Sequence, residues 1–470
     1  MSLRRPNGFI SAGYDPLKVP NPPTIGTVTP GNTQVSVAFT APLNVGGSAI
    51  TSFLVLVTDS SSGATFSNTG AASPIVVTGL TNGNTYTARV LAVNSYGPSA
   101  FSAPSGGVIP VAPPEYNLFA WGRNSNGQLG LNDVANRSSP VQVGALTDWT
   151  QTGTGEIFTV AVKTNGTLWS WGSNGSGQLG QNNTIYRSSP TQVGALTEWF
   201  KVSAGINFCA SIKTNGTLWT WGGGSLGRLG QNNTITLSSP VQVGALTDWA
   251  QVSGGSSFCA AIKTNGTLWT WGNNYSGQLG LGDRGYTSRS SPTQVGVLTD
   301  WSQVASGNNM CVAVKTNGTL WTWGQGSSGR LGLNNTIDRS SPTQVGALTD
   351  WAQASTGEGW CVAVKTNGTL WSWGDGGYGQ LGQNNTTSQS SPVQVGALTD
   401  WAQASGSTST CVAIKTNGTL WTWGNNNVGQ IGQNDVIARS SPVQVGASTN
   451  WDTISQGTTA THTLVTELVP

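Results

Sequence analysis

The chain of 470 residues is poor in charge and contains one histidine and two methionines. Charged residues make up 8% of it, whereas they make up roughly 25% of an ordinary soluble domain. Its 20 basic and 18 acidic residues leave a formal net charge of +2, so no long-range field draws the chain to nucleic acid or acidic lipid. A single histidine excludes most acid–base and metal chemistry, and we expect no catalytic residue, no metal and no cofactor.

Long apolar runs are also missing. No run approaches the roughly 18 residues that a membrane-spanning helix needs, so we expect no membrane insertion. No apolar stretch follows Arg4 and Arg5, so the sequence predicts no secretory signal. Glycine, with 65 residues, and Ser, Thr and Asn stand where strong helix formers would be needed. The length is too great for one hydrophobic core, which indicates several domains or a repeat array.

A repeat fills the second part of the chain. The dipeptide Trp-Gly recurs at intervals of 50 residues, apart from one interval of 52, with its tryptophans at Trp121, Trp171, Trp221, Trp271, Trp323, Trp373 and Trp423. The longer interval carries two extra residues around Asp283, Arg284 and Gly285. An insertion marks a loop, because a strand would lose its register.

Each unit has room for four short strands. An Asn-Gly pair such as 215–216 joins an apolar run to Thr-Leu-Trp, which predicts a hairpin whose two turn residues both have positive φ. Residues 249–253, with the pattern Trp-x-Gln-x-Ser, predict another strand, and residues 241–243 after Ser-Ser-Pro predict one more. Four strands in each of seven units predict a seven-bladed β-propeller.

The two ends of the array are complementary. The first unit starts at residues 117–121 without the two strands that normally precede them, and the chain finishes with residues 451–469, which supply two strands. We therefore expect a composite N- and C-terminal blade that closes the ring and removes its sheet edges.

These units resemble the regulator-of-chromosome-condensation repeat family, whose members carry W-G-x-N-x-x-G-Q-L-G and then G-x-x-H-T-x-A. Asn174 and residues 177–180 match the first motif, and Gly457 with residues 462–464 matches the second two residues late. The resemblance covers about residues 116–469 and implies a propeller. At the histidine position the other units hold Phe158, Phe208, Phe258, Met310, Trp360 and Thr410.

In the first hundred residues, alternating strand-like segments lie at 35–39, 50–53, 80–86 and 90–94. These segments resemble a fibronectin type III domain. The resemblance implies that Tyr86 is the buried corner tyrosine and that Phe39 replaces the family's usual tryptophan. We thus predict an all-β chain with three parts. These are an N-terminal arm (1–19), a fibronectin type III-like β-sandwich (20–112) and a seven-bladed β-propeller (113–470).

The repeated side chains are predicted to serve the fold. Tryptophans two residues apart on one strand share a face and should pack between blades. The alternative is a lectin-like circle of tryptophans whose indoles stack on bound sugars. The five cysteines occupy the same position in five successive repeat units and should be buried and reduced: Cys209, Cys259, Cys311, Cys361 and Cys411. In the other two units Thr159 and Thr461 are expected at this position. Six lysines should form surface pairs with six acids: Lys163, Lys213, Lys263, Lys315, Lys365 and Lys415 with Asp148, Glu198, Asp248, Asp300, Asp350 and Asp400.

The sequence favours a non-enzymatic structural or interaction protein, exposed on a bacteriophage virion as a decoration or adhesion protein. Its partners would be other virion proteins and a host-surface glycan or protein, without nucleic acid. The residues expected to attach the arm are Phe9, Ile10, Tyr14 and Leu17, and the expected contact loop holds Asp283, Arg284 and Tyr286.

Two alternatives place the protein elsewhere. One is a secreted, extracellular glycan-binding propeller. The other is a cytoplasmic scaffold with guanine-nucleotide exchange on a small GTPase, the best-known activity in the family that the repeats resemble. The near-identical blades and the lack of a basic tail speak against exchange.

Overall fold

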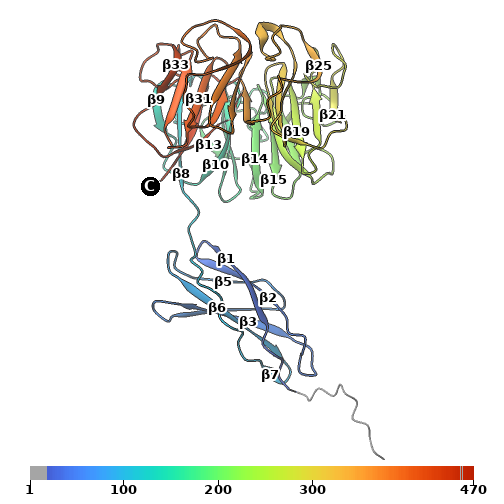
Figure 1. Cartoon of the computed structure of the whole chain (residues 1–470), viewed down its shortest axis with the longest axis vertical. Helices are drawn as coiled ribbons and strands as arrows, with labels where there is room; N and C mark the ends of the chain where they lie inside the picture. Colours follow the sequence, from blue (N-terminus) through green and yellow to red (C-terminus); the bar gives the residue numbers. More distant parts are fainter. Residues whose placement is uncertain (1–17, 456, 458, 470) are drawn as a thin grey trace, which may run out of the picture. The chain divides into compact units, whose positions relative to one another are not determined.

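The computed structural model describes residues 18–455, 457 and 459–469 (Figure 1). The chain divides into two compact units, residues 1–114 and 115–470, and both are built from strands. Two short 3₁₀ turns, η1 (Ser225–Gly227) and η2 (Ser327–Gly329), interrupt the loops of the second unit. In the part of the chain that the structure describes, no helix is long and apolar enough to cross a membrane. The predicted attachment residues Phe9, Ile10, Tyr14 and Leu17 lie outside the described residues.

The first unit is a two-sheet sandwich. One sheet has the order β1-β2-β5 and the other β4-β3-β6-β7. The strands are β1 (Thr24–Gly31), β2 (Gln34–Thr40), β3 (Ser52–Asp59), β4 (Thr65–Gly70), β5 (Ile75–Thr78), β6 (Tyr86–Asn94) and β7 (Gly97–Pro98). Alternate residues of both sheets form one core, in which Phe39 packs on Phe53 with ring centroids 4.7 Å apart. Tyr86 is buried, and its hydroxyl accepts a hydrogen bond of 2.9 Å from the N–H of Thr81, which confirms the corner tyrosine.

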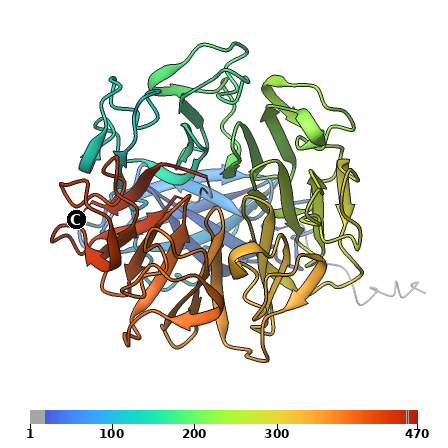
Figure 2. The same cartoon turned by 90° about the horizontal axis from the view of Figure 1, so that it is seen from above.

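The second unit contains seven four-stranded antiparallel sheets (Figure 2). Blades 1 to 3 comprise β10 (Trp149–Thr154), β11 (Phe158–Lys163), β12 (Leu168–Gly172), β13 (Arg187–Gln192); β14 (Trp199–Ala204), β15 (Phe208–Lys213), β16 (Leu218–Gly222), β17 (Leu237–Gln242); β18 (Trp249–Gly254), β19 (Phe258–Lys263), β20 (Leu268–Gly272) and β21 (Arg289–Gln294). Blades 4 to 6 comprise β22 (Trp301–Ser306), β23 (Met310–Lys315), β24 (Leu320–Gly324), β25 (Arg339–Gln344); β26 (Trp351–Thr356), β27 (Trp360–Lys365), β28 (Leu370–Gly374), β29 (Gln389–Gln394); β30 (Trp401–Gly406), β31 (Thr410–Lys415), β32 (Leu420–Gly424) and β33 (Arg439–Gln444). The first strand of each blade is the inner one, and several of these strands line a central cavity. The predicted seven-bladed propeller is confirmed.

Blade 7 joins the two ends of the propeller. It consists of β34 (Trp451–Ile454), β35 (His462–Leu468), β8 (Tyr116–Gly122) and β9 (Arg137–Gln142), paired in that order. β35 runs antiparallel to β8 from the pair His462–Gly122 to the pair Leu468–Tyr116. The composite blade is therefore as predicted. In this blade the residue that pairs with the Trp-Gly tryptophan, a cysteine in five other blades, is Thr463. The prediction that Thr461 holds this position was wrong, because the strand starts one residue after it.

The Asn-Gly hairpins differ from the predicted turn. Gly166 has a φ of +74°, whereas Asn165 is not among the described residues with positive φ. The N–H of Gly166 donates to the carbonyl of Lys163 at 2.8 Å, so a type I turn precedes the left-handed glycine. The Asn165 side chain accepts hydrogen bonds from the N–H and the hydroxyl of Thr167, at 3.1 and 2.7 Å. The asparagine thus caps the turn, and the prediction of positive φ at both residues was wrong.

The outer strands also begin earlier than predicted. β17 starts at Leu237 and contains the Ser-Ser-Pro segment, whereas the prediction placed the strand at residues 241–243. A proline has no N–H to donate, and an edge strand is the one place in a sheet where that loss is tolerated. The segment therefore belongs to the strand and protects its outer edge.

One hydrogen bond recurs between all neighbouring blades. The indole Nε1–H of each Trp-Gly tryptophan donates to a backbone carbonyl in the Gly-x-x-Gly loop of the preceding blade, at 2.8–3.0 Å. The acceptor is the residue that follows the first glycine of that loop. The donors Trp121, Trp171, Trp221, Trp271, Trp323, Trp373 and Trp423 bond in that order to Gln430, Gln128, Gln178, Arg228, Gln278, Arg330 and Gln380. All seven rings are fully buried, as the prediction of a wedge between blades requires.

The glycine that ends this loop leaves room for the indole. In the loop of blade 2, Gly230 has a φ of +69°, and a Cβ there would lie 2.9 Å from Nε1 of Trp271. Gly244 in the same repeat unit has a φ of +60°, and nothing lies within 4 Å of a Cβ added there. A side chain at either glycine would therefore strain the backbone by a similar amount, but only a side chain at Gly230 would also press on the tryptophan.

We expect Gly230→Ala to lower the free energy of unfolding of the propeller by about 1–3 kcal/mol more than Gly244→Ala, because overpacking is added to the same backbone cost. Urea unfolding followed by tryptophan fluorescence measures both variants. Equal destabilisation would show that the indole contact is not what requires the glycine.

Candidate functional site

The six repeated lysines are part of the fold. Each Nζ lies 3.2–3.4 Å from a carboxylate oxygen, and the lysine side chains are 5–8% exposed, whereas the carboxylates are 35–54% exposed. Each ammonium also lies over two tryptophan rings, with 4.3–5.0 Å to the centroids. The pairing was predicted correctly, but its place at the surface was wrong, because the lysine stems lie between indoles. These cations are not free to bind nucleic acid.

The cysteines and the histidine are buried as well. All five cysteines are free, and burial raises the pKa of each thiol. The Nε2 atom of His462 lies 2.9 Å from the hydroxyl of Thr159, and burial lowers the pKa of His462 to about 3. In the described part of the chain, no group of three or more His, Cys, Asp or Glu side chains is placed to hold a metal.

Two arginines replace glutamine in the Gly-x-x-Gly loops of blades 2 and 4. Arg228 donates to the carbonyl of Ser225 at 2.9 Å and to the Asn207 side chain at 2.8 Å. Arg330 donates in the same way to the carbonyl of Ser327 at 3.0 Å and to the Gln325 side chain at 3.1 Å. Burial lowers the pKa of both guanidinium groups. Both arginines stabilise their own loops.

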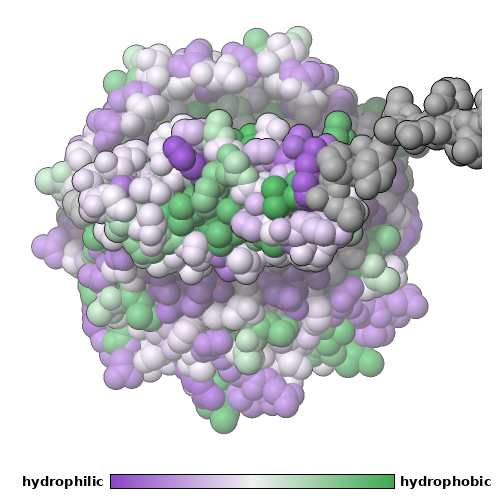
Figure 3. Space-filling view, turned by 90° about the horizontal axis from the view of Figure 1, so that it is seen from below, coloured by the Kyte–Doolittle hydropathy of each residue, from purple (hydrophilic) through white to green (hydrophobic). Residues whose placement is uncertain are grey.

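Exposed apolar residues are mostly dispersed around the ring. A leucine of the loop before six of the seven inner strands is 46–49% exposed, at Leu146, Leu196, Leu246, Leu298, Leu348 and Leu398. In Figure 3 one green apolar group lies near the centre of the view, and smaller ones are scattered around it among polar residues. Dispersed apolar residues of this kind are normal on a protein surface, and they mark no binding site by themselves.

The insertion between β20 and β21 breaks this regularity. Tyr286 is 96% exposed and packs edge-on against Tyr275, which is 59% exposed, with ring centroids 5.7 Å apart. Arg284 is 63% exposed, and its guanidinium lies 3.6 Å from the carboxylate of Asp338 on the next blade. We call Tyr275, Arg284 and Tyr286 the tyrosine patch.

The structure divides the predicted contact loop into two roles. Asp283 accepts hydrogen bonds of 2.6 Å from both Asn274 and Arg289, so its carboxylate holds the loop together. Arg284 and Tyr286 lie at the surface, as a contact role requires. Tyr275 was missed, although the sequence carried a signal: the six equivalent positions hold serine, glycine or asparagine.

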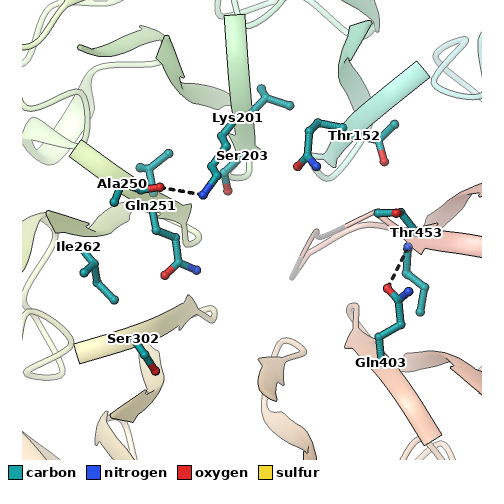
Figure 4. A pocket seen from close by; sticks show the side chains of 13 residues that line it. Thr152, Lys201, Ser203, Ala250, Gln251, Ile262, Ser302, Gln403 and Thr453 are labelled. Atoms are coloured by element: carbon teal, nitrogen blue, oxygen red, sulfur yellow. Dashed lines mark hydrogen bonds between the residues drawn. The ribbon is translucent and has the colours of Figure 1, made fainter. Parts of the chain in front are cut away.

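A second irregular region lies in the central channel. A cavity of about 460 Å³ is lined by residues of the inner strands (Figure 4). Lys201 is the one ionisable side chain among its lining residues, and the corresponding position holds glutamine in five blades and threonine in blade 7. Its Nζ donates to the carbonyl of Ala250 at 2.9 Å and lies 5.4 Å from the ring centroid of Phe200. Sequence reasoning missed this lysine too, although it departs from the repeat.

Comparisons with known families agree with the architecture. The Regulator of chromosome condensation (RCC1) repeat matches residues 117–162, 165–212, 215–262, 265–314, 317–364, 367–414 and 417–465. A second description of the same repeat matches residues 150–178, 249–278, 301–330 and 403–430. The Fibronectin type III domain matches residues 21–108. No curated protein matches the chain.

Solved structures share the propeller fold. Human WBSCR16 is 20% identical, with a TM-score of 0.66 over 75% of this chain and 98% of that one. A structure of Kap60 bound to yeast RCC1 (Prp20) gives 18% identity and a TM-score of 0.67 over 76% of this chain and 90% of the other. Prp20p from Saccharomyces cerevisiae, in a structure described with its binding properties to Gsp1p and histones, gives 19% identity and a TM-score of 0.66, over 76% and 92%.

The buried histidine predicts how stability depends on pH. The pKa of His462 is about 3 in the fold and about 6.5 in the unfolded chain, so below about pH 6.5 the unfolded chain binds a proton that the folded chain does not. The contribution of His462 to stability is therefore constant above that pH and is lost as pH falls, at about 1.4 kcal/mol per pH unit.

His462→Phe, which introduces the residue found at the equivalent Phe158, should remove this decline between about pH 6.5 and 4.5, above the range where carboxylates titrate. Chemical unfolding at a series of pH values measures it, and His462 is the single histidine of the chain. The same decline in both proteins would contradict the assignment.

Proposed function

This chain belongs to the regulator of chromosome condensation repeat family, and from that membership we propose that it is a non-enzymatic scaffold whose propeller binds a protein partner. The observation that carries the proposal is the tyrosine patch, where exposed side chains depart from the repeat. Tyrosine and arginine are enriched among the residues that dominate binding energy in protein interfaces. The yeast propeller has been solved with Kap60 bound and described with its binding properties to Gsp1p and histones, which supports the class of function.

The patch has features that favour binding. The two tyrosine rings lie edge to face with centroids 5.7 Å apart, and both are exposed, so a partner can reach two neighbouring aromatic side chains at once. Arg284 is positioned by Asp338 while most of its surface remains accessible. A partner that offers an apolar surface next to a carboxylate or carbonyl would match these side chains.

We propose further that the partner is met outside a cell and that the protein is an exposed decoration or adhesion protein of a bacteriophage virion. The low charge, the abundance of glycine and the fibronectin type III domain ahead of the propeller support this setting. In this proposal the arm attaches the protein to other virion proteins and the propeller binds the host surface. A secreted glycan-binding propeller and an intracellular exchange-like scaffold are the alternatives.

Replacing both tyrosines by Tyr275→Ser and Tyr286→Ser in the full chain should weaken its binding to host cells about tenfold or more, since such residues are typical hot spots. The melting temperature should not change, because both rings are exposed. Binding of the fluorescently labelled chain to cells measures the effect. Tyr186→Ser and Tyr378→Ser, at residues 50% and 54% exposed on other blades, are the matched controls. Equal binding by all variants would refute the role of the patch.

The virion proposal is tested on purified particles. Mass spectrometry should detect the protein in them, and a fragment of residues 1–112 should attach to particles that lack it, whereas residues 113–470 should not. The reason is that the arm has apolar side chains and no core of its own in which to bury them. Attachment by the propeller fragment alone would reverse the assignment. Nucleotide release from a small GTPase on addition of the chain would favour the exchange-like scaffold instead.

A further inference from the structure

Four inner-strand glutamines of the central channel bond to the next blade. In blades 3 to 6 the inner-strand glutamine donates through Nε2 to a backbone carbonyl of the next blade and accepts from a backbone N–H there. Gln251 bonds to Val304 at 3.1 and 3.1 Å, Gln303 to Ala354 at 2.9 and 2.9 Å, Gln353 to Ala404 at 3.2 and 3.1 Å, and Gln403 to the carbonyl of Asp452 and, at 3.3 Å, the N–H of Ile454. Along this arc the amides are paired and rigid.

The arc from blade 7 to blade 2 is built differently. Thr453 replaces the glutamine in blade 7, and its hydroxyl donates to Asp452 of its own blade. In blade 1, Gln151 is exposed and has no side-chain hydrogen bond to the described part of the chain. In blade 2, Lys201 replaces the glutamine and makes one hydrogen bond to a backbone carbonyl. We call Gln151, Lys201 and Thr453, with Thr152 beside them, the open arc; Figure 4 shows its labelled members around the opening.

The charge in the open arc is not balanced by the protein. Lys201 has no carboxylate within 4.0 Å among the described residues, whereas all six repeated lysines have one. An ammonium group has three donors, and the carbonyl of Ala250 takes one of them. Burial also lowers the pKa of Lys201, which means that the site disfavours the charged form until an anion is present.

We propose that the open arc binds a small free carboxylate that also carries hydroxyl groups, such as a sugar acid. One lysine balances one carboxylate, whereas a phosphate dianion would need a second cation that the lining does not contain. The exposed amide of Gln151 can donate to and accept from sugar hydroxyls, and the hydroxyl oxygen of Thr453, which donates its hydrogen to Asp452, can accept from one. The cavity of about 460 Å³ is in the range of small-molecule sites, roughly 300–1,000 Å³. This site is separate from the tyrosine patch and does not depend on the proposed function.

Calorimetric titration of the full chain with D-glucuronate tests the proposal. We expect one binding site per chain, with Lys201→Gln lowering the affinity about tenfold or more through loss of the charged hydrogen bond. That variant places in blade 2 the glutamine that blades 3 to 6 already use, so it should fold. Gln151→Ala, at an exposed side chain, should weaken binding by a smaller factor. Arg89→Gln removes the same charge from β6 of the sandwich and should leave binding unchanged.

Two competitors sharpen the test. D-Glucose, which lacks the carboxylate, should bind about tenfold or more weakly than D-glucuronate, and inorganic phosphate should not displace it. No binding of D-glucuronate at millimolar concentration would overturn the proposal. So would equal affinity in the wild type and Lys201→Gln, or displacement by phosphate at equal concentration.

Discussion

The propeller depends on one contact, the indole N–H of a tryptophan donating to a loop carbonyl of the preceding blade. The contact explains the repeat motif residue by residue. In blade 1 the side chain of Asn174 accepts the N–H of Leu179 and so folds the loop, and the N–H of Trp221 reaches the carbonyl of Gln178. Gly180 must lack a Cβ because Nε1 of Trp221 would lie 2.9 Å from it. Each unit therefore completes its neighbour, and none buries its tryptophan alone.

Closure of the ring follows from the same contact. Trp121, from the first repeat strand of the chain, donates to Gln430 of blade 6, and β35 pairs with β8 to supply the inner half of blade 7. In the closed ring most of the repeated polar and charged side chains are buried or bonded to other parts of the propeller. The lysines lie between indoles, the cysteines are buried, and four of the channel amides bond to the next blade. The side chains left for binding are those that depart from the repeat, namely the tyrosine patch and Lys201.

The features that recur with the 50-residue repeat could be predicted from the sequence, whereas contacts between side chains of different units or strands could not. The blades, the composite closure and the lysine–acid pairing follow from spacing and local pattern, whereas the role of Tyr86 follows from the resemblance to a fibronectin type III domain. The sequence did not reveal that Asn165 caps its turn or that the lysines are buried, because both depend on side chains meeting in three dimensions. Tyr275 was missed because its partner Tyr286 lies in an insertion. Lys201 was missed because its meaning depends on the neighbouring amides, which lie about one repeat away on adjacent strands.

Hydrogen exchange of the tryptophan indoles tests the central claim, that a single repeated bond holds the ring and also closes it. In the native protein labelled at the indole nitrogen, nuclear magnetic resonance can follow the seven Trp-Gly tryptophans separately. We expect all seven Nε1–H groups to exchange at the same slow rate, set by unfolding of the whole propeller, with Trp121 as slow as the other six. Fast exchange at Trp121 with protection of the rest would contradict closure through the composite blade.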